Sequence, residues 1–178
     1  MRALIAYESM YGNTHAVADA IGEGLRGSGD WAVDVRSIHD VTDPALDAVD
    51  LLVVGGPTHV HGMSHSNTRG SAATAATREG SDLELDPDMA GEGVREWLGG
   101  ITVPLPRAAA FDTRLDANAV LTGRASKGIA KALRRHGAEL VTEPESFLVS
   151  KENHLLPTEW AHALRWGQRL GAEAVAIS

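Results

Sequence analysis

The chain has 178 residues, of which 43% are hydrophobic and 22% are charged, values typical of one globular domain spanning residues 1–178. It contains no cysteine, which excludes disulfides, thiolate catalysis and cysteine-ligated metals. The formal net charge of −8 disfavours a nucleic-acid-binding role. No apolar run reaches the length of a membrane span, and no signal peptide is expected, so a cytoplasmic location is the expectation.

Apolar runs and helical patterns alternate along the chain. Strands are expected at 2–7, 31–37, 51–56 and 108–111 and within 139–149; helices are expected at 14–26, 93–98, 126–135 and 159–174, with a short helix or turn at 43–48. This alternation predicts an α/β fold, a doubly wound parallel sheet with helices on both faces. An extended excursion at about 64–92 does not fit a minimal domain, and it is interpreted as either a surface segment or a lid.

A short polar loop follows the first strand and precedes the first helix. In Tyr7-Glu8-Ser9-Met10-Tyr11-Gly12-Asn13-Thr14, the hydroxyls of Ser9 and Thr14, the amide of Asn13 and the helix N-terminus together favour a bound phosphate. Gly12 allows a tight turn. The loop has no Lys or Arg and is not a Walker loop, so a phosphate that stays in place, as in a bound cofactor, suits it best.

Ser9-Met10-Tyr11-Gly12-Asn13-Thr14 resembles the FMN-phosphate loop of the flavodoxin family, whose usual pattern is [ST]-x-[ST]-G-x-T. Tyr11 departs from that pattern where Ser or Thr is common. The resemblance implies five parallel strands in the order 2-1-3-4-5. It also implies FMN as cofactor, at the carboxyl ends of strands 1 and 3.

The resemblance assigns two further loops to the flavin ring. One is Pro57-Thr58-His59-Val60-His61-Gly62, after the third strand, in which the Gly62 peptide could bond flavin N5. The other is Asp112-Thr113-Arg114, after the fourth strand, whose backbone would bond the pyrimidine edge. Both loops lack the aromatic residues that many flavodoxins stack on the ring. Gly55 is interpreted as part of a tight turn.

Two functions remain open from the sequence. An electron carrier, which is favoured, would exchange electrons with a reductase or an acceptor protein. An FMN-dependent oxidoreductase would act on a quinone or porphyrinogen over the exposed ring. A remote alternative, a metal hydrolase, rests on the His59, His61 and His65 pattern.

Two other patterns are given structural interpretations. Gly22-Glu23-Gly24-Leu25-Arg26-Gly27 matches G-x-G-x-x-G, but it lies in the wrong context for a dinucleotide site and is expected to terminate the first helix. Lys127, Lys131, Arg134 and Arg135 form a basic helix face that is expected to be solvated, although it could dock an anionic partner or a nucleotide.

Overall fold

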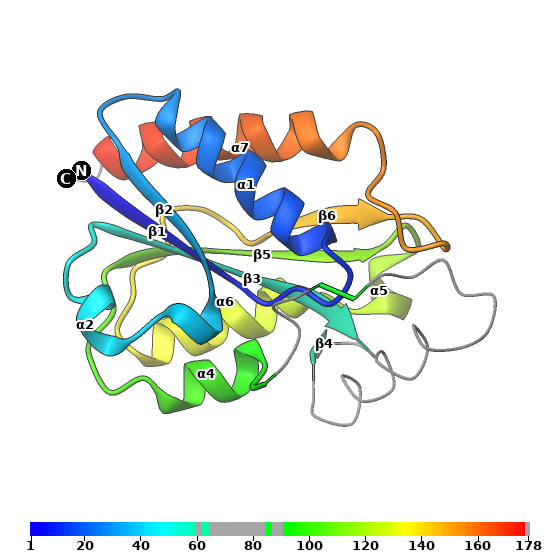
Figure 1. The fold of residues 1–178 in the computed structure, drawn as a ribbon, viewed down its shortest axis with the longest axis horizontal. Helices are drawn as coiled ribbons and strands as arrows, with labels where there is room; N and C mark the ends of the chain where they lie inside the picture. Colours follow the sequence, from blue (N-terminus) through cyan, green and yellow to red (C-terminus); the bar gives the residue numbers. More distant parts are fainter. Residues whose placement is uncertain (60–61, 65–84, 87–90, 177–178) are drawn as a thin grey trace.

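A computed structural model of the chain describes residues 1–59, 62–64, 85–86 and 91–176. Its central sheet contains the strands β1 (Arg2–Tyr7), β2 (Ala32–Ser37), β3 (Leu51–His59), β4 (Gly62–Met63), β5 (Arg107–Leu115) and β6 (Glu145–Val149). The helices are α1 (Asn13–Arg26), α2 (Asp43–Leu46), α4 (Val94–Gly100), α5 (Ala119–Thr122), α6 (Ala125–Arg135) and α7 (Glu159–Ala176), with a 3₁₀ turn at Ile38–Asp40. The helices α1 and α7 lie on one face of the sheet, and α2, α4 and α6 lie on the other (Figure 1).

The parallel strands follow the order β2-β1-β3-β5-β6, which confirms the predicted order 2-1-3-4-5. A sixth strand, the two-residue β4, pairs antiparallel with the end of β3 and was not predicted. From β1 the chain passes to β2 on one side, and β3 then returns to the other side of β1. This reversal creates the crevice at the carboxyl ends of β1 and β3 where open α/β sheets bind ligands.

The core consists of two clusters, one on each face of the sheet. Ile5, Val53 and Phe111 face α1 and α7, while their neighbours Leu4 and Leu52 face the opposite layer. Successive strand residues point to opposite faces, so strands buried on both sides appear as continuous apolar runs. Each fully buried side chain of this size contributes about 1.5–3 kcal/mol, which explains why the strands were recognisable in the sequence.

Glycines allow α1 and α7 to pack closely. A Cβ atom on Gly24 would lie 2.1 Å from the Leu164 carbonyl oxygen, and one on Gly167 would lie 2.2 Å from the Ile21 carbonyl oxygen. Gly22 and Gly24 are buried inside α1, so the expectation that the glycines of Gly22–Gly27 terminate this helix is wrong for both. Only Gly27 caps the helix end.

The third and fourth predicted strands end later than expected. β3 continues to His59 and β5 to Leu115, because Gly55, Gly56 and Pro57 pair with β5 in parallel register. Pro57, Thr58, His59, Asp112, Thr113 and Arg114 are therefore strand residues, not loop residues. Gly55 is not in a turn either, since it pairs with Phe111 across β3 and β5. It must be glycine because a Cβ atom there would lie 2.0 Å from the Phe111 ring.

Trp166, rather than Trp160, anchors the last helix in the core. Trp160 is 42% exposed, whereas Trp166 is 1% exposed and packs edge-on against Phe111 and Phe147. Trp160 lies on the outer side of the first turn of α7, one position away from the buried stripe. Within the described ranges, no helix is long and apolar enough to cross a membrane.

Candidate functional site

A cavity of about 160 Å³ opens at the carboxyl ends of the central strands. Its walls come from the loop after β1, the start of α1, the ends of β3, β5 and β6, and the turn after β6. The lining residues predicted from the sequence are Met10, Tyr11, Asn13, Thr14, Pro57, Thr58, His59, Thr113 and Arg114. The sequence did not indicate Leu115, Val149, Ser150, Lys151 and Asn153, which complete the walls.

The N-terminus of α1 is suited to an anion. Gly12 precedes the helix with φ of 83°, a left-handed conformation that favours glycine. No side chain caps the helix, and its first turn contains no acidic residue. The first backbone N–H groups of an uncapped helix lack helical acceptors, and the helix dipole adds positive potential there.

Two hydroxyl side chains of this loop form hydrogen bonds within the protein. Ser9 Oγ accepts a hydrogen bond from the Gly12 N–H at 3.1 Å. The hydroxyls of Thr14 and Thr113 lie 2.8 Å apart and are buried, which joins α1 to the end of β5. Ser9 and Thr14 therefore help to hold the loop in shape through these hydrogen bonds.

Asn13 fastens α1 to the turn after β6. Its Nδ2 donates to the Asn153 carbonyl oxygen at 2.8 Å, and its Oδ1 accepts from the Leu155 N–H at 2.9 Å. Asn153 has φ of 64°, and it is the only described non-glycine residue with positive φ. Asn153 Nδ2 is buried and has no hydrogen-bond partner within the described chain. A buried donor without an acceptor is uncommon in folded proteins, so Asn153 Nδ2 stands out among the residues of the cavity wall.

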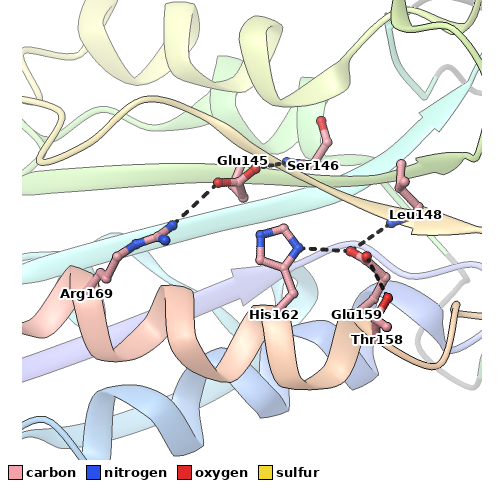
Figure 2. Close-up of polar contacts among 7 residues, drawn as sticks. All are labelled: Glu145, Ser146, Leu148, Thr158, Glu159, His162 and Arg169. Atoms are coloured by element: carbon pink, nitrogen blue, oxygen red, sulfur yellow. Dashed lines mark hydrogen bonds and ion pairs between the residues drawn. The ribbon is translucent and has the colours of Figure 1, made fainter.

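The strand before this turn is held from the other side by α7, as Figure 2 shows. Glu159, at the start of α7, is 7% exposed. Its Oε2 accepts from the Leu148 N–H at 3.2 Å and lies 3.1 Å from His162 Nδ1. Leu148 precedes Val149 and Ser150 in the cavity wall. The Glu159 carboxylate thus fixes β6, an edge strand, and with it this wall of the cavity.

Cationic groups also face the cavity. Arg114 donates through Nη1 to the carbonyl oxygens of Leu115 and Ala117, at 3.2 and 2.8 Å. Its Nε is buried and has no partner among the described residues. Arg114 and Lys151 line the cavity, and no Asp or Glu does so in the described part of the chain. The potential in the cavity therefore favours an anion, although the loop after β1 has no cation of its own.

His59 and Thr58 line the cavity from the end of β3. Burial lowers the pKa of His59, which favours its neutral form. Thr58 Oγ1 accepts from the Ala125 N–H at 2.8 Å, so this hydroxyl orients the start of α6.

Some predicted residues do not reach the cavity. Asp112 is fully buried, and its Oδ2 accepts from the Ser126 N–H at 2.7 Å. Burial raises the pKa of Asp112, although the hydrogen bond to Ser126 partly opposes the shift. Gly62 pairs with His59 in β4 and does not line the cavity. Ser9 and Gly12 shape the loop without lining it. Val60 and His61 lie outside the described residues.

Glu8 points away from this cavity and ties the loop to α4. Its Oε1 accepts from Ser64 Oγ at 2.5 Å, and its Oε2 accepts from the Val94 N–H at 2.8 Å. Its own N–H donates to the Gly55 carbonyl oxygen at 3.0 Å. No local sequence pattern indicates this role of the Glu8 carboxylate, which is 4% exposed. Glu8 fixes the direction in which the loop leaves β1.

The histidine pattern considered as a metal site is only partly described. His59 lies in β3, while His61 and His65 fall outside the described residues. Among the residues that are described, no group of three His, Asp or Glu side chains is arranged to hold a metal ion.

Comparisons with known proteins agree with this geometry. Residues 4–68 match the model of a flavodoxin domain. A flavodoxin from the domain Archaea is 21% identical, with 98% of this chain and 99% of that chain covered and a TM-score of 0.65. Oxidised flavodoxin 1 from Bacillus cereus is also 21% identical, with 99% and 98% covered and a TM-score of 0.62.

A larger protein contains the same fold as one of its parts. Rubredoxin oxygen:oxidoreductase from Desulfovibrio gigas is 17% identical and has a TM-score of 0.64. The match covers 98% of this chain but 36% of that protein. None of the curated proteins matches the sequence.

Proposed function

We propose that this chain is a member of the flavodoxin family that binds FMN in the cavity at the α1 N-terminus and serves as an electron carrier. The flavodoxin-domain match at residues 4–68 and the shared fold support this proposal. The observation that carries the proposal is a cavity bordered by groups that lack hydrogen-bond acceptors. It lies at the uncapped N-terminus of α1, and two of its lining residues, Arg114 and Asn153, each hold a buried donor without a partner among the described residues. FMN carries a phosphate, ribityl hydroxyls and ring carbonyls, which supply acceptors for all three.

The phosphate would be held mainly by backbone groups. Gly12 sets the turn, and the N–H groups that begin α1 point out of the helix end. Ser9 and Thr14 support this arrangement through the bonds to Gly12 and Thr113. Such a site binds a phosphate through a preformed shape, which suits a resident cofactor.

The donors on the opposite walls would hold the rest of the cofactor. Arg114 Nε and Asn153 Nδ2 would donate to oxygen acceptors, and His59, kept neutral by burial, would add no charge beside them. The cavity of about 160 Å³ is smaller than the 300–1,000 Å³ typical of closed ligand pockets. It therefore accommodates part of FMN and leaves part outside. The bound flavin would supply the redox chemistry, while the chain supplies position and charge.

The proposed partners are redox proteins, a reductase or an electron acceptor, in the cytoplasm. A second candidate function is an FMN-dependent oxidoreductase that acts on a quinone or porphyrinogen. One observation favours it. Tyr11 and His59 carry the only aromatic rings among the described lining residues, so a planar substrate could reach the flavin.

The first test is the visible spectrum of the purified protein, followed by titration of flavin-stripped protein with FMN and with riboflavin. We expect FMN to bind with quenching of its fluorescence and riboflavin to bind much more weakly, because riboflavin lacks the phosphate. Equal affinity for the two would refute the assignment of the α1 N-terminus. Turnover with NADH or NADPH and a quinone separates the two functions: a carrier passes electrons to a protein acceptor without rapid quinone turnover.

A further inference from the structure

A second cavity, of about 530 Å³, lies along α6 and shares no lining residue with the proposed flavin site. It is bounded by α6 and by the segment that leads into β6. The residues around it are Arg124, Lys127, Ala130, Arg134, Glu143 and Pro144. This volume falls within the range of small-molecule sites, so the basic face of α6 is hollowed rather than flat.

Three cations border this cavity in a chain whose net charge is −8. Lys127 and Arg134 are seven positions apart, two turns along one side of α6. Neither side chain forms an ion pair or hydrogen bond within the described ranges. Arg124 is held in place, because its Nε donates to Ser146 Oγ at 2.9 Å and its Nη2 to the Pro144 carbonyl oxygen at 2.6 Å. Its guanidinium keeps further N–H donors available.

We propose that this cavity binds a nucleoside polyphosphate. The rise of an α-helix places Lys127 and Arg134 about 10 Å apart along its axis, and a chain of two or more phosphates could contact both side chains. Glu143 would repel bare phosphate but can accept hydrogen bonds from ribose hydroxyls. Ala130 and Pro144 offer an apolar surface to a base. A deep cavity of this kind suits a small ligand better than the flat face of an acidic protein.

The test uses ADP as the probe on the full chain, by isothermal titration calorimetry at low salt. The double variant Lys127→Gln/Arg134→Gln removes two cations from the cavity. The double variant Lys131→Gln/Arg135→Gln removes the same charge from the same helix but does not touch the cavity. We expect saturable ADP binding to the wild type and to the second variant, and a loss of about tenfold or more in the first. Thermal unfolding of both variants checks that they are folded.

Pyrophosphate and a poly-glutamate peptide are the two other ligands titrated in the same experiment. We expect ADP to bind more tightly than pyrophosphate. Glu143→Gln should reduce this difference in affinity, because the variant no longer carries the negative charge that repels bare phosphate. Absence of saturable ADP binding, equal losses in the two double variants, or a preference for poly-glutamate would each overturn the proposal. The last result would instead identify this face as a docking surface for an acidic protein.

Discussion

Asn13 links two parts of the chain that meet only in the folded protein. Its side chain makes two hydrogen bonds, to the Asn153 carbonyl oxygen and from the Leu155 N–H, at 2.8 and 2.9 Å. Asn13→Ala removes both. Each such bond contributes a net of about 0.5–1.5 kcal/mol, so the free energy of unfolding should fall by about 1–3 kcal/mol. For a domain of this length, that corresponds to a decrease of about 2–12 °C in Tm.

The measurement is urea unfolding of flavin-stripped protein, combined with titration of the same protein with FMN. Asn13→Ala should lower both stability and FMN affinity, because it releases the turn that carries Asn153. The matched control is Asn153→Gly, which keeps the carbonyl acceptor and tolerates φ of 64° but removes the unpaired Nδ2. It should leave stability nearly unchanged and weaken FMN binding roughly 2- to 13-fold.

The two variants distinguish two roles for Asn13. If its side chain bonded the phosphate directly, Asn13→Ala would lower FMN affinity and leave the flavin-stripped protein as stable as the wild type. That result would refute the reasoning that Asn13 acts by holding the turn.

Three further predictions concern the framework. Gly24→Ala should destabilise the protein by about 1–3 kcal/mol or more, because its Cβ would meet the Leu164 carbonyl oxygen; Gly99→Ala, with open space around it in α4, should not. Glu159→Ala should lower the free energy of unfolding by about 1–3 kcal/mol because it leaves the Leu148 N–H unpaired, and Glu159→Gln should lower it less. Urea unfolding measures the two glycine variants and the two Glu159 variants. Burial raises the pKa of Asp112, so the folded state holds this proton more tightly than the unfolded chain. As pH falls from 7 through the raised pKa, the wild type should therefore gain stability relative to Asp112→Asn; a difference that does not change with pH would contradict this.

The central strands and the phosphate loop could be predicted because their signals are local, whereas the strand order followed from the resemblance to the flavodoxin family. Leu51 to Val54 are apolar without interruption because both faces of β3 are buried. The ends of the strands could not be predicted, because Gly55, Gly56 and Pro57 look like a turn in isolation. Their pairing with β5 overrides that local preference, and Phe111 fills the space that Gly55 leaves open.

Asn153 and Glu8 were missed for a related reason. Asparagine tolerates a left-handed conformation and so marks a possible turn. Nothing near residue 153, however, indicates that this turn contacts Asn13, 140 positions earlier. Glu8 sits in a polar loop and resembles a solvated residue, but the Val94 N–H that it accepts lies 86 positions away. Contacts of this range follow from the sheet order and not from local pattern.

The residues of the loop after β1 therefore have different roles from those that the sequence motif suggests. Ser9, Asn13 and Thr14, the polar residues that match the flavodoxin pattern, direct their side chains into the protein. Asn13 and Thr14 also line the cavity, together with Arg114 and Asn153 from distant parts of the chain. If the motif residues shape the site and these distant donors contact the cofactor, variants of Arg114 and Asn153 should change FMN affinity without unfolding the protein. Variants of the motif residues should change FMN affinity and stability together.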